Sequence, residues 1–200
     1  MKQIFEKILK YINLIDYYNK KMNLVSYKNL SELFINHIID SISILEYVNF
    51  ENYKNVMDLG SGCGLPGIPL SIILPSVKFY LVESKIKYIQ FLKKAKNELN
   101  LNNVEIIHSR VENCLELKNI VDIILVRAVG DVAKVLEYLN SFIDNNISII
   151  FYKGEKVKQE LKNYENQLKE AGINFIELYK SNFMGIFGIS HYFLLVRKIV

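Results

Sequence analysis

Apolar side chains recur every three or four positions at the start of the chain, as they do on one face of an amphipathic helix. The apolar positions in this stretch include Ile4, Ile8, Ile12 and Ile15. The spacing predicts a helix over residues 2–21, with a polar break after it.

A second helical pattern follows the break, and we expect it to run from Ser31 to about Tyr47. Ser31 is a suitable first residue because a serine hydroxyl can accept a hydrogen bond from a free backbone N–H of the first turn. His37 and Asp40 are three positions apart, so their side chains share a face of that helix. Residues 1–50 are therefore predicted to form an all-helical N-terminal cap.

From residue 51 onward, short apolar segments rich in β-branched and aromatic residues alternate with helical patterns. This alternation predicts an α/β domain over residues 51–200, with a Rossmann-like, doubly wound and mostly parallel seven-stranded sheet. The last two strands are joined by SNFMGIFGIS, which has two glycines and no helical pattern, so we expect one antiparallel edge strand. The predicted strands are 55–59, 78–83, 104–109, 121–127, 147–153, 174–180 and 191–198, and the predicted helices are 66–74, 85–99, 131–143 and 155–171.

The composition of the chain is that of a globular protein and gives no sign of a membrane span, a disulfide framework or a metal site. Half of the 200 residues are hydrophobic, which is typical of a globular chain. No apolar run reaches the ~18 residues of a membrane span, and the N-terminus lacks an apolar signal segment, so we expect a cytoplasmic protein without membrane contact. The two cysteines form neither a disulfide framework nor a metal-ligand spacing, so no metal is expected. The early helices show no obvious dimer stripe, which favours a monomer.

Charge is unevenly distributed along the chain. The net charge is +4, but residues 51–100 and 151–200 are each net positive by three, whereas residues 101–150 are net negative. A basic face for a polyanion such as a nucleic acid is compatible with this distribution, as is an ordinary solvated surface.

Glycine and proline are concentrated in one stretch. Four of the nine glycines and all three prolines lie within residues 55–75. The spacing Gly62-x-Gly64-x-x-Gly67 matches the dinucleotide-binding fingerprint, in which glycines allow positive φ and a close approach of backbone to ligand. We therefore expect a strand, a Gly-rich turn (residues 60–67) that includes Gly60 and Gly62 as ligand contacts, and a helix.

Acidic residues on both sides of the turn indicate that the ligand contains an adenosyl group. Asp58 opens Asp-Leu-Gly-x-Gly-x-Gly, which resembles the first motif of class I S-adenosylmethionine methyltransferases. Glu83 ends the next predicted strand, where a carboxylate can accept both ribose hydroxyls of an adenosyl ligand. Val111 and Glu112 follow the third strand, where they can contact the adenine ring and its amino group. These positions suit NAD and S-adenosylmethionine equally, but the antiparallel strand favours the methyltransferase fold.

Arg127 and Lys153 end the fourth and fifth predicted strands, at the sheet edge where ligands bind in this architecture. No Pro-Pro motif follows Arg127, as amine-modifying enzymes would have, and neither Cys63 nor Cys114 is well placed as a nucleophile. The remaining candidates for methylation are target atoms that already have a free lone pair, such as a ring nitrogen of a purine. Small-molecule methylation, an NAD-binding oxidoreductase and a nucleotide-binding module without catalysis stay open as alternatives.

Taken together, these motifs resemble the glucose-inhibited division protein B family, the bacterial small-subunit rRNA guanine-N7 methyltransferases. The most specific match is DLGSGCGLPGIP, which begins at Asp58. Tyr18 departs from the family, which usually has Trp there. The other matching motifs are Tyr18-Asn19-Lys20, Asn23-Leu24, His37-Ile38-Ile39-Asp40-Ser41, Glu83-Ser84, Arg110-Val111-Glu112, Arg127-Ala128 and Lys153-Gly154.

The resemblance implies S-adenosylmethionine as cofactor and a guanine in the 530 loop of 16S rRNA as target, on naked rRNA or on a 30S particle. On this basis we expect Arg127 to order the methionine end of the cofactor and the guanine, and Lys153 and residues 18–41 to hold RNA. The expected catalytic residues are Arg127, Lys153 and His37. The cofactor contacts implied by the family are Gly60, Leu65, Val111, Glu112 and Arg127, to which Gly62 and Glu83 are added from the motifs.

Overall fold

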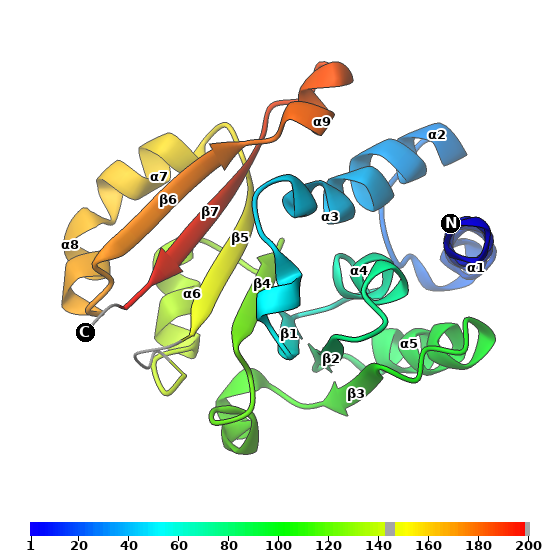
Figure 1. Ribbon diagram of the computed structural model, residues 1–200, viewed down its shortest axis with the longest axis horizontal. Coiled ribbons are helices and arrows are strands. Elements are labelled where there is room, and N and C mark those ends of the chain that lie inside the picture. The colour runs from blue at the N-terminus through cyan, green and yellow to red at the C-terminus, as the bar shows by residue number, and fades with distance from the viewer. Residues whose placement is uncertain (143–146, 199–200) are drawn as a thin grey trace.

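The computed structural model describes residues 1–142 and 147–198, and Figure 1 shows helices on both faces of a single twisted sheet. All seven strands lie within two residues of their predicted limits, because each is a short apolar run bounded by turn residues. The strands are β1 (Asn55–Leu59), β2 (Lys78–Glu83), β3 (Val104–His108), β4 (Ile123–Arg127), β5 (Ser148–Gly154), β6 (Phe175–Lys180) and β7 (His191–Arg197).

The strand order is β3-β2-β1-β4-β5-β7-β6, and β1 to β5 pair in parallel. The chain winds in opposite directions from β1 and from β4, so the switch point lies between these strands. In open α/β sheets, ligands bind outside the carboxyl ends of the strands at this point.

The sheet is mixed, as expected, and the antiparallel strand is β7. It lies one position in from the edge, between β5 and β6, and β6 forms the edge. Because β7 is antiparallel to both neighbours, β6 runs parallel to β5. The residues that follow β6 therefore lie at the same sheet edge as the ends of β1, β4 and β5.

Side chains of the central strands alternate between two cores. Val56 points into the core beneath the cap, α4 and α5, whereas Met57 points into the core beneath α6 and α8. Both faces are covered, which explains why most residues of these strands are apolar. No helix in the described part of the chain combines the length and apolar character needed to cross a membrane. The covering helices are α4 (Gly67–Ile73), α5 (Ile86–Glu98), α6 (Val132–Tyr138), α7 (Val157–Asn163) and α8 (Glu165–Glu170).

The cap begins with α1 (Lys2–Met22), as predicted. The second helix begins earlier than expected: Asn29, not Ser31, is its N-cap, and the Asn29 side chain accepts the N–H of Glu32 at 2.9 Å. This helix is not uniform, since it contains a π-helical turn, a feature frequent at functional sites. Its parts are α2 (Leu30–Leu33), a π-helix (Phe34–Ile39), α3 (Asp40–Ile42) and a 3-10 turn (Ser43–Glu46).

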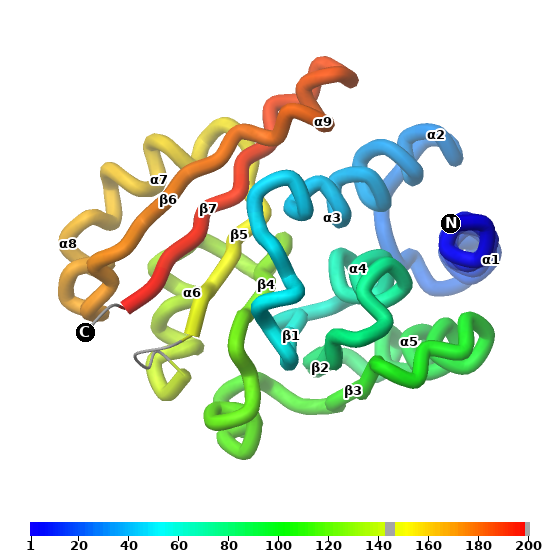
Figure 2. The backbone as a smooth tube through the Cα atoms, viewed as in Figure 1, coloured from blue at the N-terminus to red at the C-terminus, as the bar shows by residue number. Residues whose placement is uncertain are grey.

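The cap shares its core with the sheet domain. Tyr11 and Ile15 of α1 are fully buried in the same cluster as Phe79 of β2 and Phe91 of α5. Figure 2 shows α1 lying against α5, with α2 and α3 above α4. The division at residue 50 remains a prediction.

Three further differences from the predictions concern the helices of the C-terminal half. The helix expected over 155–171 is broken at Tyr164 into α7 and α8. The helix expected over 131–143 ends at Tyr138, and residue 143 lies outside the described residues. The connection between β6 and β7 contains a short helix, α9 (Asn182–Ile186), where none was expected; the Ser181 side chain caps it by accepting the N–H of Met184 at 3.2 Å.

Candidate active site

The Gly-rich turn leaves the end of β1 with a left-handed backbone. Gly60, Gly62 and Gly64 have φ of 67°, 55° and 95°, a region that L side chains rarely adopt. The N–H groups of Gly60 and Ser61 both donate to the carbonyl oxygen of Val82, at 2.9 and 3.2 Å. The turn is thus fixed to the end of β2, with Glu83 directly beside it.

Asp58 lies beneath the turn and supports it. Its Oδ2 accepts the N–H of Gly67 at 3.0 Å, and the residue is 1% exposed. A Cβ on Gly67 would lie 2.6 Å from this oxygen and 2.4 Å from Leu81, so only glycine fits there. Burial raises the pKa of Asp58 to about 7. Asp58 therefore supports the Gly-rich turn from below and does not line the cavities beside it.

The Glu83 carboxylate organises the backbone around it. Its Oε2 accepts the N–H of Gly62 at 2.9 Å, and its Oε1 accepts those of Ser84 and Lys85, each at 2.8 Å. A carboxylate offers about four acceptor positions, so three are occupied and one is left for a ligand hydroxyl. The expectation that it accepts both ribose hydroxyls requires one of these backbone bonds to yield.

Two cavities open at the carboxyl edge of the sheet and share Gly60, Glu83 and Val129. The first has about 430 Å³ and is bounded by the Gly-rich turn, the cap and Arg127. The second has about 320 Å³ and is bounded by the turn after β3, including Val111 and Glu112. All the predicted cofactor residues therefore line one of two cavities that share a wall.

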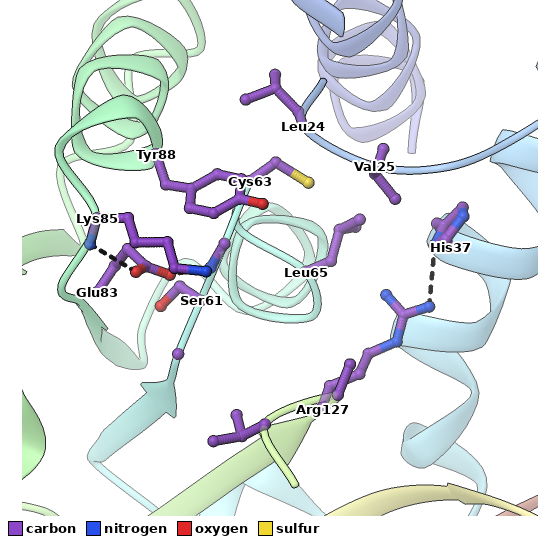
Figure 3. A pocket seen from close by; sticks show the side chains of 14 residues that line it. Leu24, Val25, His37, Ser61, Cys63, Leu65, Glu83, Lys85, Tyr88 and Arg127 are labelled. Atoms are coloured by element: carbon purple, nitrogen blue, oxygen red, sulfur yellow. Dashed lines mark hydrogen bonds between the residues drawn. The ribbon is translucent and has the colours of Figure 1, made fainter. Parts of the chain in front are cut away.

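Arg127 reaches from the end of β4 into the first cavity, where it meets the cap (Figure 3). Its Nη2 donates to the carbonyl oxygen of Asn36 at 2.8 Å and lies 3.1 Å from His37 Nδ1. Its Nε lies 3.1 Å from Asp40 Oδ2. Its Nη1 has no partner among the described residues, so it is available to a ligand. Ala128, next along the chain, adopts a left-handed φ of 57° that turns the backbone away.

His37 supports Arg127 and has no free nitrogen. An arginine N–H only donates, so Nδ1 of His37 must be the acceptor and the ring proton lies on Nε2. Nε2 is 3.0 Å from the carbonyl oxygen of Ser26, which can accept that proton. Burial, with the charge of Arg127 next, lowers the pKa of His37, which favours the neutral ring that this geometry requires. The expected catalytic histidine therefore positions Arg127 in this structure.

Asp40 connects the cap to the far strands. It is 2% exposed, and its Oδ1 lies 2.8 Å from Nδ1 of His191, the first residue of β7. Sequence reasoning placed Asp40 on the face of His37 but missed His191. The pairing depends on the antiparallel register of β7 with β5, where His191 lies opposite Gly154. No local sequence pattern carries that information.

Lys153, which was expected to hold RNA, forms an ion pair within the protein. Its Nζ lies 2.8 and 3.1 Å from the two carboxylate oxygens of Glu160, and it donates to the carbonyl oxygen of Gly130 at 3.0 Å. Glu160 also accepts the N–H of Val132 at 2.5 Å. This pair joins the ends of β4 and β5 to α7, and a role for Lys153 in holding RNA remains a prediction.

The loop after α1 forms one wall of the first cavity through Leu24 and Val25. The side chain of Asn19 holds it: Oδ1 accepts the N–H groups of Leu24 and Val25 at 2.6 and 3.0 Å, and Nδ2 donates to the carbonyl oxygen of Val25 at 2.8 Å. Tyr11, fully buried, donates from its hydroxyl to the carbonyl oxygen of Cys63 at 2.7 Å. Sequence reasoning missed Tyr11, although a phenol on the apolar stripe of α1 was a signal.

Both cysteines are buried thiols. Burial raises the pKa of Cys63 to about 12, so it is not a nucleophile near neutral pH. Burial also raises the pKa of Cys114. In the residues described, no three His, Cys, Asp or Glu side chains are grouped so as to hold a metal ion.

Comparison with known proteins agrees with this geometry. The family model described as rRNA small subunit methyltransferase G matches residues 4–181. A similar protein is ribosomal RNA small subunit methyltransferase G of Brachyspira hyodysenteriae, 38% identical over 175 residues, which are 86% of this chain and 83% of that protein. The protein of the same name from Thermoanaerobacter pseudethanolicus is 32% identical over 197 residues, 97% of this chain and 82% of that one.

Solved structures share the fold at low identity. A putative S-adenosyl-L-methionine-dependent methyltransferase of Methanococcus maripaludis has a TM-score of 0.64 at 16% identity, covering 94% of this chain and 92% of that one. M. jannaschii TYW2 in complex with AdoMet has a TM-score of 0.62 at 19% identity, and the match covers 88% of this chain and 79% of that one.

Proposed function

Since the chain belongs to the family of rRNA small subunit methyltransferase G, we propose that it methylates N7 of a guanine in 16S rRNA, in the 530 loop. Membership of this family makes the chain an S-adenosylmethionine-dependent rRNA methyltransferase. The methylated atom and the loop are our proposal, and they follow from the family resemblance. The observation that supports it best is Arg127, which is held on three sides at the switch point with one nitrogen left free.

The two adjoining cavities support the binding of an extended adenosyl cofactor across their shared wall. Val111 and Glu112 would hold the adenine in the second cavity, Glu83 the ribose, and Leu65 and Arg127 the methionine end in the first. Gly60 and Val129 line both cavities, and a Cβ on Gly60 would lie 2.8 Å from Val129, so a side chain at position 60 would crowd the boundary between them. The cofactor, when bound, supplies a methyl group on a positively charged sulfur.

The residues around the first cavity favour a target that is already nucleophilic. His37 has both nitrogens engaged and Cys63 is a neutral thiol, so neither can activate a substrate. Guanine N7 carries its own lone pair and needs no proton removed. The chain then contributes by orienting the target in line, which in well-oriented systems supplies roughly 7–11 kcal/mol, and by excluding water with Leu24, Val25 and Leu65.

The Asp40 carboxylate suits this chemistry. Methylation at N7 makes the guanine cationic, and an unpaired arginine nearby would oppose that charge. Asp40, 3.1 Å from Arg127 Nε, compensates the arginine charge while Nη1 remains free to donate to the cofactor carboxylate or to guanine O6.

The test uses purified protein, S-adenosylmethionine labelled in its methyl group, and two substrates lacking the mark, 16S rRNA and 30S particles. We expect label in one guanine on at least one of them, and loss of transfer in Arg127→Ala with S-adenosylhomocysteine binding measured separately. Absence of label on both substrates would refute the proposal.

We further propose that the enzyme acts in the cytoplasm as a monomer. The support is the family's ribosomal substrate and the burial of the apolar stripe of α1 against α4 and α5. Sedimentation at micromolar concentration should give the mass of one chain, 23.3 kDa. A stable dimer would contradict this part of the proposal.

A further inference from the structure

Large apolar side chains face solvent in the connection between β6 and β7. Phe183, Ile186 and Phe187 are 51%, 75% and 46% exposed, although they lie within five residues of one another. We call residues 181–190 the α9 loop. Isolated exposed apolar residues are common, whereas a cluster of this kind usually marks an interaction site.

The α9 loop lies beside the candidate active site. It follows β6, which is parallel to β5, so it lies at the carboxyl edge of the sheet together with Arg127 and Lys153. Met184 and Ile189 line a cavity of about 320 Å³ whose other walls include those two basic residues. Figure 1 shows α9 next to the end of α3, above the sheet edge. A substrate that reaches Arg127 from this side passes the loop.

Hydrogen bonds to the cap hold the backbone of the α9 loop in place, so the fold itself keeps the apolar side chains of the loop exposed. The N–H of Phe183 donates to the carboxylate of Glu46 at 3.1 Å, and that of Asn182 donates to the hydroxyl of Tyr47 at 3.2 Å. Met184, on the inner side of α9, is 1% exposed. The helix thus holds one apolar residue inward and presents its aromatic residues outward.

We propose that the α9 loop is a stacking surface for unpaired rRNA bases that flank the target guanine. The loop contains no charged side chain, so its chemistry suits the flat faces of bases and not phosphates. Specific RNA recognition commonly uses unpaired bases stacked on aromatic side chains. Enzymes that modify a base inside a helix take it out of its stack, which also exposes its neighbours. This inference rests on the proposed function and assigns a part of the substrate to a surface outside the cofactor site.

The kinetic test compares wild type with the Phe183→Ala/Phe187→Ala double variant on 16S rRNA or 30S particles. We expect KM for the RNA substrate to rise about tenfold or more, because each lost base stack weakens binding substantially. The kcat, the S-adenosylhomocysteine affinity and the Tm should stay within about twofold or a few degrees of wild type, since the side chains are exposed. Phe5→Ala is the matched control, since Phe5 is 61% exposed on α1.

A binding test separates this inference from the proposed function. A short single-stranded RNA containing 2-aminopurine, whose fluorescence is quenched on stacking, is titrated with wild type, Phe5→Ala and the double variant. Quenching that the double variant alone loses supports the stacking surface even if methylation occurs elsewhere. Equal KM and equal quenching in all three proteins would overturn it. Sedimentation that shows a wild-type dimer dissociated by the double variant would overturn it too, because the surface would then bind a second copy of this chain.

Discussion

At the scale of single residues, the proposed function depends on how Arg127 is held. The guanidinium is fixed by Asn36, His37 and Asp40, all from the cap, and Asp40 is in turn in contact with His191 from β7. Each partner comes from a segment distant in the sequence. The buried carboxylate of Asp40, between Arg127 and His191, therefore fixes the position of the Arg127 guanidinium. The guanidinium nitrogen Nη1, which has no partner among the described residues, is thereby held in place for a ligand.

Asp40→Asn should damage both stability and activity. It removes the negative member of a buried pair, and breaking such a pair destabilises proteins by about 3 kcal/mol. Misplacement of Arg127 by about 1 Å should lower kcat/KM by about 100-fold. Urea unfolding and methyl-transfer kinetics measure the two effects. His191→Asn keeps a donor near the Nδ1 position and should retain most activity, whereas equal losses in His191→Asn and His191→Phe would contradict the positioning role.

Two glycines of the turn should respond differently to substitution. A Cβ at Gly67 would lie 2.4 Å from Leu81, so Gly67→Asn should destabilise the fold by more than the roughly 1–3 kcal/mol of ordinary overpacking. At Gly62 the nearest atom is 4.0 Å away and only the left-handed φ matters, which Asn tolerates. Gly62→Asn should therefore change the free energy of unfolding by less than about 1 kcal/mol. Similar losses in both variants, measured by denaturant unfolding, would contradict this distinction.

At the scale of elements, the cap completes the wall of the first cavity, the proposed cofactor site. α1 supplies Tyr11, which bonds the Gly-rich turn, and the loop after α1 supplies Leu24 and Val25 to the cavity wall. The ammonium of Lys87 on α5 donates to the carbonyl oxygens of Met22 and Asn23 and fixes the end of α1. The sheet domain alone would leave the cavity open on this side.

Tyr11→Phe should weaken cofactor binding without removing any side chain from the cavity. The carbonyl oxygen of Cys63 would lose its buried donor, at a cost of about 1–3 kcal/mol. We expect a lower Tm and a weaker Kd for S-adenosylhomocysteine by calorimetry. Tyr17→Phe is the control, since Tyr17 is 55% exposed. An unchanged Kd in Tyr11→Phe would show that α1 does not support the turn.

The strands were predictable from sequence because each is a continuous apolar run between turn residues, and parallel strands are buried on both faces. The helices of the C-terminal half were less so. The break at Tyr164 and the helix α9 depend on packing and on local caps such as Ser181. Neither feature changes the spacing of apolar residues enough to be predicted from the sequence. Asn29 was overlooked as a cap since Ser31 is an equally good one by residue type.

The site was predictable where a residue is tied to the end of a strand. Gly60, Glu83, Val111 and Arg127 all line the expected cavities. The partners of these residues were not predictable, because the contacts Asp40–His191 and Lys153–Glu160 depend on register and on helix placement across the fold. A single sequence gives the type of a side chain but not its long-range partner.

At the scale of the whole molecule, buried Asp58 should give stability an unusual pH dependence. Its pKa is about 7 in the folded state and 3.8 in an ordinary environment. Between about pH 4 and 7 the folded state keeps a proton that the unfolded state releases, so the free energy of unfolding falls as pH rises, by up to about 1.4 kcal/mol per pH unit. Above pH 7 this contribution is constant.

Asp58→Asn should remove that decline. Urea unfolding of both proteins at several pH values from 5 to 8 isolates the effect of Asp58, because other groups, including His37 with its lowered pKa and opposite sign, remain in both. Parallel stability profiles for wild type and Asp58→Asn would contradict the assignment.

The central claim is that the cavities beside Arg127 bring a guanine of 16S rRNA to a bound S-adenosylmethionine. The most direct measurement is mass-spectrometric mapping of 16S rRNA after reaction of unmarked 30S particles with the purified enzyme. We predict one added methyl group, on N7 of a single guanine in the 530 loop, which is missing with Arg127→Ala. A methyl group on another nucleotide or another atom, or none at all, would contradict it.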